Sequence, residues 1–268
     1  MSQFHLQESA PDTTPKVKEQ PRKNAIPVPF SYYPSDDGTD HNLLILLHGL
    51  GDTHIPFAKM GRSLKLPQTA ILALRATEQI PFFDEGAFQW YKSFDQLGDM
   101  IENPNPTPAL ELMKKVIDHL VQDLHWSLNQ IHLFGFAQGG SVAAEYALLR
   151  WREQLRGQEA GASPPATSFG SLVTVSGSLI SYPTIANLSP TPTLVVYRSA
   201  PAEDALQPTA VRAFKKGFQS VSEAKLGGNR SGMPASKEEW EPIMKFWSEK
   251  LSRRKMDGLY EVMSGMST

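Results

Sequence analysis

The chain has 268 residues, which suits one large α/β domain or two small ones, and its hydrophobic content of 40% supports a substantial core. A formal net charge of −2 leaves no overall basic field that would indicate nucleic acid or an anionic membrane as a partner. The absence of cysteine excludes disulfides, thiolate metal sites and a cysteine nucleophile.

Residues 1–26 are rich in proline, lysine, glutamate and glutamine and show no apolar periodicity, which predicts a disordered polar tail. The start of the chain lacks the apolar stretch of a secretory signal, and no apolar run is long enough to span a bilayer. We therefore predict a cytoplasmic protein without a transmembrane segment. Directly after the tail, residues 30–33 are typical of an edge strand.

Short apolar runs then alternate with helical patterns along the chain. The strand-like runs are bounded by turn residues, as expected for buried parallel strands, and they comprise residues 43–47, 70–74, 131–134, 172–175 and 193–197. Helical spacing of apolar residues occurs over 108–124 and again after a capping box at 236–239. This alternation predicts an α/β fold with a mostly parallel central sheet and helices on both faces. We expect the domain to cover 27–252, followed by a C-terminal tail over 253–268.

The most informative stretch is Gly135-Phe136-Ala137-Gln138-Gly139, which lies between an apolar strand and a helix of small residues. In α/β-hydrolases, a Gly-x-Ser-x-Gly turn at such a junction presents a serine nucleophile. Here Ala137 holds the apex, and a methyl group cannot attack a carbonyl carbon. The stretch predicts the architecture of an esterase site without its nucleophile.

A second glycine turn, His48-Gly49-Leu50-Gly51-Asp52-Thr53, follows the early strand 43–47. Oxyanion donors in α/β-hydrolases come from a loop of this kind and from the residue after the nucleophile. We therefore expect the backbone N–H groups of Leu50 and Gln138 to be the two donors. The surrounding cleft is expected to be lined by His48, Gly49, Trp90 and Tyr91.

These two motifs, together with Gln89-Trp90-Tyr91, resemble those of the phospholipase/carboxylesterase family, which includes the acyl-protein thioesterases. The resemblance extends over residues 27–252. It implies an α/β-hydrolase fold and hydrolysis of carboxylic esters or acyl thioesters, with no cofactor and no metal.

The acid and the base both depart from the family's pattern. The family's acid lies in a loop after the penultimate strand; Asp204 is the nearest match, although the preceding His-Gly is absent, so a solvated loop carboxylate is an equal interpretation. The family's histidine precedes the final helix, where Ala235 stands. All seven histidines lie at or before residue 132, ahead of the elbow. Because this fold orders its triad as nucleophile, acid and base, no downstream histidine can serve as the base.

Loss of the serine or histidine of a triad lowers turnover on the order of 10⁶-fold. We therefore predict a catalytically impaired pseudo-hydrolase that binds an acyl or ester-like small molecule or a lipidated protein. The alternative is an active carboxylesterase or acyl-protein thioesterase that uses a non-standard nucleophile, such as Ser176 or Ser178 with His54.

Overall fold

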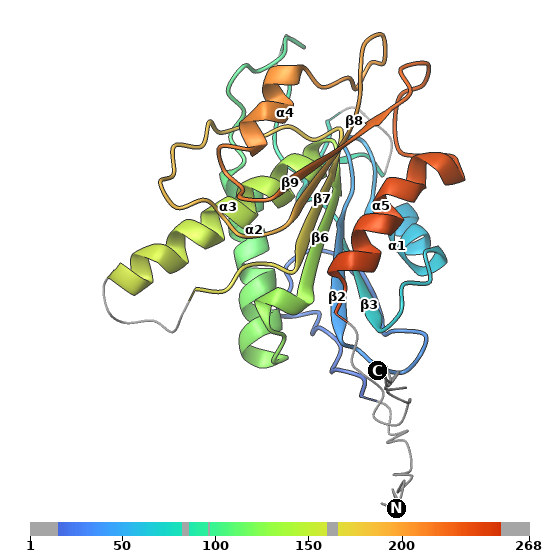
Figure 1. Ribbon diagram of the computed structural model, residues 1–268, viewed down its shortest axis with the longest axis vertical. Helices are drawn as coiled ribbons and strands as arrows, with labels where there is room; N and C mark the ends of the chain where they lie inside the picture. Colours follow the sequence, from blue (N-terminus) through green and yellow to red (C-terminus); the bar gives the residue numbers. More distant parts are fainter. Residues whose placement is uncertain (1–15, 82–85, 96, 160–165, 253–268) are drawn as a thin grey trace, which may run out of the picture.

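The computed structural model describes residues 16–81, 86–95, 97–159 and 166–252. At its centre is a seven-stranded sheet in the order β1-β3-β2-β6-β7-β8-β9 (Figure 1). Its strands are β1 (Phe30–Tyr33), β2 (Asn42–Leu47), β3 (Thr69–Leu74), β6 (Ile131–Phe136), β7 (Ser171–Val175), β8 (Thr193–Arg198) and β9 (Val221–Leu226). Strand β1 runs antiparallel to β3, and the other neighbours in this sheet are parallel. The predicted mostly parallel sheet is confirmed.

The central strands place the functional loops at one edge of the sheet. Every residue of β2 and β3 is buried, as expected for strands covered on both faces. In the register of the sheet, Leu47 at the end of β2 pairs with Leu74 of β3 and with Gly135 of β6. The carboxyl ends of these three strands therefore lie side by side, which is where ligands bind in open α/β sheets.

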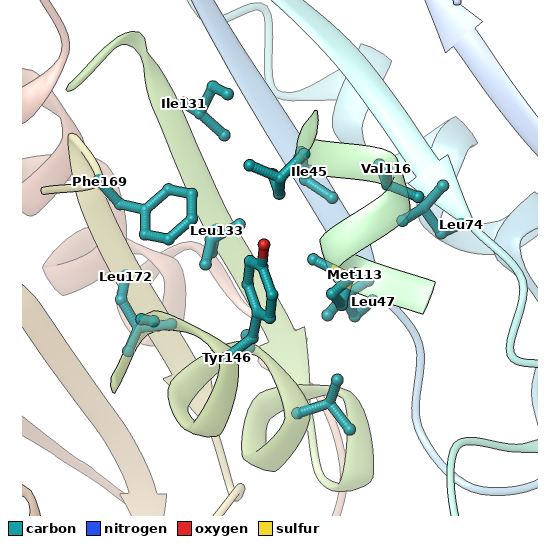
Figure 2. Close-up of a cluster of buried hydrophobic side chains, with 14 of the residues drawn as sticks. Ile45, Leu47, Leu74, Met113, Val116, Ile131, Leu133, Tyr146, Phe169 and Leu172 are labelled. Atoms are coloured by element: carbon teal, nitrogen blue, oxygen red, sulfur yellow. The ribbon is translucent and has the colours of Figure 1, made fainter. Parts of the chain in front are cut away.

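Helices cover both faces of the sheet, as predicted (Figure 1). One face carries α1 (His54–Ser63) and α5 (Lys237–Lys250), and the other carries α2 (Thr107–Asp118), the π-helix η1 (His119–Asp123), α3 (Gln138–Glu159) and α4 (Pro208–Phe214). Figure 2 shows the core on the α3 face, where the Tyr146 ring lies near Leu133 and Phe169. Each face buries its own apolar cluster, so the sheet is the middle layer of three.

Short elements complete the fold. A separate antiparallel pair joins β4 (Glu78–Gln79) to β5 (Phe88–Gln89), and the 3₁₀-helix η2 (Leu128–Gln130) precedes β6. Strand β9 was not predicted because it is an edge strand and is not a continuous apolar run. Ser222, Glu223 and Lys225 are exposed, while Ala224 and Leu226 are buried.

The predicted polar tail over 1–26 is wrong for residues 16–26, which pack against the domain. Ile26 is buried in the main core, and the Lys18 N–H donates to Asp40 Oδ2 at 2.9 Å. The Arg22 guanidinium forms an ion pair of 2.7 Å with an acid of η1, Asp123. Composition is misleading here because polar contacts, which leave no apolar periodicity, supply most of the attachment.

Residues 1–15 of that predicted tail, and the predicted C-terminal tail over 253–268, lie outside the described residues. Among the helices that the structure does describe, none combines the length and the apolar character needed to cross a bilayer.

Candidate active site

The elbow at the end of β6 has the backbone conformation of a nucleophile turn. Ala137 adopts a φ of 46°, in the left-handed region that costs a non-glycine residue roughly 1–2 kcal/mol. Its N–H donates to the Val175 carbonyl at 2.8 Å, and its carbonyl accepts from Ser141 N–H at 3.0 Å. The turn therefore keeps its strained geometry although the side chain at the apex is a methyl group.

Two glycines allow this turn to form. A Cβ on Gly135 would lie 2.3 Å from the backbone of Gly139, and a Cβ on Gly139 would lie 2.4 Å from the His48 carbonyl oxygen. Both approaches are far closer than a side-chain carbon permits, so only glycine fits at these positions. The second contact also brings the start of α3 directly against the turn that follows β2.

His48 holds that turn as a neutral, fully buried group. Its Nε2 accepts the Ala76 N–H at 3.0 Å, which leaves the proton on Nδ1 to be donated to the Gly49 carbonyl at 2.7 Å. Burial lowers the pKa of His48 to about 4, so the imidazole stays uncharged at neutral pH. His48 thus fixes the predicted oxyanion loop by hydrogen bonding.

Gln138 connects the elbow to the segment after β5. Its side chain accepts the Trp90 N–H at 2.9 Å and donates to the Tyr91 carbonyl at 2.9 Å and to Ser93 Oγ at 2.6 Å. Its backbone N–H is the first of α3, and such groups have no partner within their own helix. That N–H is accordingly available to an acceptor at the elbow.

The residues expected to line the cleft lie at different depths. His48 and Trp90 have 0% exposure, and the Trp90 indole donates to the His48 carbonyl at 2.8 Å, so both support the site from below its surface. Gly49 and Tyr91 are also buried, whereas Leu50 is 39% exposed. The exposed part of this loop is therefore Leu50 together with the next residue, Gly51.

The structure places Asp204 beside the elbow, in the loop after β8. Its Oδ2 accepts the Ser176 hydroxyl at 2.7 Å and the Gly232 N–H at 3.1 Å, and its Oδ1 is buried without a partner. Ser176 directly follows β7 and has a φ of 54°, and a Cβ on the adjacent Gly177 would lie 2.7 Å from the Ala137 carbonyl oxygen. A solvated loop carboxylate does not describe Asp204, because both of its oxygens are engaged or enclosed.

The loop before α5, where the family has its histidine, is held in place by carboxylates that accept its backbone N–H groups. Ala235 is exposed, and its N–H donates to Glu239 Oε2 at 2.9 Å, whereas the amide that meets Asp204 is that of Gly232. Glu239 also pairs with Arg198, whose guanidinium donates to its two oxygens at 2.8 and 3.0 Å.

Arg198 fastens this loop to the sheet. It is 1% exposed and donates to the carbonyls of Gly227 and Gly232 at 2.8 and 3.3 Å. Hydrogen bonding to Arg198 lowers the pKa of Glu239 to about 2. Sequence reasoning missed Arg198, Gly232 and the ion pair; the only local signal was the capping box, and the Ser236 hydroxyl does accept the Glu239 N–H at 3.3 Å.

The alternative nucleophiles are placed differently from the prediction. Ser176 has Asp204 as its partner, and no hydrogen bond joins it to His54 within the described residues. His54, at the start of α1, has a buried Nδ1 without a partner. Ser178 is half-buried two residues beyond Ser176. In the part of the chain that the structure describes, no cluster of three or more His, Asp or Glu side chains could hold a metal ion.

Comparison with known proteins assigns the chain to a protein family. The family model described as Phospholipase/Carboxylesterase matches residues 34–193, more than half of the chain. The chain belongs to this family. It is also 40% identical over 223 residues to an uncharacterized hydrolase of Mycosarcoma maydis, covering 82% of this chain and 80% of that protein.

Solved structures agree on the fold of this phospholipase/carboxylesterase family member. The esterase PE8 superposes with a TM-score of 0.66 at 17% identity, covering 84% of this chain and 99% of that one. The acyl-protein thioesterase 2 of Zea mays superposes with a TM-score of 0.60 at 19% identity, covering 84% and 100%. The chain has the α/β-hydrolase fold, as predicted.

Proposed function

We propose that this chain is a pseudo-hydrolase that binds an acyl or ester-like ligand at the elbow and does not cleave it at an enzymatic rate. The observation that carries this proposal is the strained turn at Ala137, which keeps a serine-hydrolase backbone around a methyl group. The backbone N–H groups of Leu50 and Gln138 are the donors that such a ligand would meet.

The acid and base positions support the same conclusion. Asp204 is bonded to a hydroxyl and an amide where a triad acid would orient an imidazole. No histidine follows residue 132 in the sequence, so the base is absent from the chain's downstream half. Binding and oxyanion donors alone leave about 10³–10⁴-fold acceleration over water, far below the rate of a complete triad.

The retained half of the site suits carbonyl-containing ligands. A methyl side chain in place of a serine's hydroxymethyl makes the apex more apolar and leaves the backbone donors in place. An acyl group on a small molecule or on a lipidated protein offers the matching carbonyl oxygen and apolar chain. We propose a cytoplasmic role in holding such a group, as a binding protein or as a regulator of an active relative.

Equilibrium binding of a fluorescent long-chain acyl ester tests this proposal. We expect saturable binding that Leu50→Pro weakens, because proline removes the backbone N–H, while the matched variant Leu50→Ala keeps the amide and retains affinity. Absence of saturable binding, or equal affinity in both variants, would contradict the proposal.

A second candidate function is serine hydrolysis with Ser176 as the nucleophile. The hydrogen bond of 2.7 Å from Ser176 to Asp204 and the positive φ at this strand end favour it, because a carboxylate in contact with a hydroxyl is a general base by position. Labelling with a fluorophosphonate and mapping of the modified peptide separates the two candidates. A stoichiometric adduct on Ser176 that is lost in Ser176→Ala establishes the second; an unlabelled protein supports the first.

A further inference from the structure

An arginine that has no carboxylate partner among the described residues lies beside the predicted oxyanion loop. Arg75 directly follows β3, and the next residue, Ala76, donates its N–H to His48 Nε2 at 3.0 Å. The Arg75 guanidinium lies over the Phe88 ring, 4.1 Å from its centroid. The Phe88 backbone carbonyl accepts the Gly51 N–H at 2.9 Å, so the residue whose ring lies against Arg75 is hydrogen-bonded through its main chain to the predicted oxyanion loop.

Within the part of the chain that the structure describes, the donors of this guanidinium have no acceptor. Among the residues that the structure describes, Arg75 forms no side-chain hydrogen bond or ion pair, and its Nε is buried without a partner. The acid in the adjacent turn, Asp52, accepts the N–H of its neighbour Thr53 at 2.7 Å. A guanidinium presents five N–H donors and no acceptor, so an unpaired one at a ligand-binding edge matches an anion.

His54 adds a second unpaired nitrogen to the same place. Its Nδ1 is buried and has no partner in the described residues. Burial and, secondarily, the charge of Arg75 lower the pKa of His54, so the imidazole is neutral at neutral pH. Arg75 is therefore the positive charge of this cluster, and His54 contributes no second charge.

We propose that the site holds the free carboxylate of an acyl chain in preference to its ester, with Arg75 as the group that recognises the negative charge. This inference rests on the proposed acyl-binding function. The backbone donors at the elbow serve one carboxylate oxygen, and the charge is met by Arg75. A neutral ester uses only the backbone donors and gains nothing from the guanidinium.

The missing catalytic groups fit this preference. In a working esterase the carboxylate is the product, which has to leave before the next turnover. A site without nucleophile and base has no such requirement. With Arg75 at its edge, such a site can retain the carboxylic acid that an active esterase would release as its product.

Calorimetric titration of the full chain with octanoate and with methyl octanoate tests the inference. We expect octanoate to bind about tenfold or more tightly than its methyl ester, since hydrogen bonds between charged groups are roughly twice as strong as neutral ones. Arg75→Gln is expected to remove that preference and to leave the affinity for the methyl ester unchanged.

The matched control is Arg62→Gln. Arg62 also lies over an aromatic ring, 4.5 Å from the centroid of Tyr33, but it is in the last turn of α1, and Tyr33 pairs with Ile71 in the amino-terminal half of β3. This variant removes the same charge and the same kind of stacking away from the elbow. Both affinities are expected to stay at the wild-type values.

The outcomes are distinguishable. Equal affinities for acid and ester, or an unchanged octanoate affinity in Arg75→Gln, overturns the inference and leaves the proposed function standing. Absence of saturable binding of either probe overturns both. If Arg75→Gln does not fold, Arg75→Lys keeps the charge and is expected to retain a preference for octanoate; a folded Arg75→Lys without that preference overturns the inference.

Discussion

The Ser176 hydroxyl and the Asp204 carboxylate form a hydrogen bond of 2.7 Å that occupies Oδ2 and leaves Oδ1 enclosed and unpaired. The two residues follow different strands, β7 and β8, and the bond joins them next to the Ala137 turn. One oxygen of the Asp204 carboxylate therefore has no hydrogen-bond partner in the described residues that an imidazole introduced into the loop before α5 would have to displace.

Restoration of activity requires both lost groups. Ala137→Ser alone is expected to give almost no hydrolysis of p-nitrophenyl butyrate, because no base is available for the hydroxyl. Ala137→Ser combined with Ala235→His is expected to exceed the single variant by about 10²-fold or more, the usual contribution of a positioned base. High activity in the single variant would show that another residue already acts as the base.

The ion pair between Arg198 and Glu239 is expected to stabilise the fold. The Arg198 side chain is 1% exposed and that of Glu239 is 17% exposed, so Glu239→Gln leaves a buried charge uncompensated. We expect a loss of unfolding free energy of about 2 kcal/mol or more in urea denaturation. The matched variant Glu238→Gln changes an exposed neighbour and is expected to leave stability nearly unchanged.

The same pair predicts a dependence on acid. The pKa of Glu239 is about 2 in the folded protein, below its usual 4.5. The folded state therefore binds this proton less readily than the unfolded state, and the stabilisation is lost as pH falls from about 4.5 towards 2. Urea unfolding at several pH values in this window should show a weaker dependence in Glu239→Gln, and an unchanged slope contradicts the assignment.

Two buried histidines make the protein less stable in mild acid. Burial lowers the pKa of His132 and of His48 to about 4, whereas an unfolded histidine titrates near 6.5. Between these values the unfolded state binds more protons, so unfolding free energy falls as pH drops from 6.5 to 4. The expected loss of unfolding free energy between pH 7 and pH 5 is about 2 kcal/mol per histidine. In urea titrations, His132→Gln should lose about 2 kcal/mol less than the wild type over this pH range.

The segment 16–26 is expected to contribute to stability. Ile26 is 2% exposed within the main core, so Ile26→Ala should lower the unfolding free energy by about 2–4 kcal/mol in urea denaturation. The matched change Lys23→Ala, at an exposed position of the same segment, is expected to have little effect. Equal stability of the Ile26 variant and the wild type would indicate that this segment is not part of the folded domain.

Local pattern was sufficient to predict much of the fold. Strands such as β2 and β3 are continuous apolar runs because both of their faces are covered. Neighbouring residues within such a run are therefore all apolar, and the run can be recognised from the sequence alone. The edge strand β9 and the segment 16–26 were not predictable in this way, because half or more of their residues are polar and their attachment depends on distant partners.

The sequence by itself determined what the elbow lacks. Ala137 stands at the apex of a glycine-flanked turn, and no histidine follows residue 132, so the missing hydroxyl and base are properties of the amino-acid order. Tertiary structure alone decided how the remaining groups are used. These groups contact residues from other elements of the fold: Asp204 bonds to Ser176, Arg198 pairs with Glu239, and Arg75 lies over the Phe88 ring. Hydrogen bonds and charges act through space, so no local pattern could have revealed them.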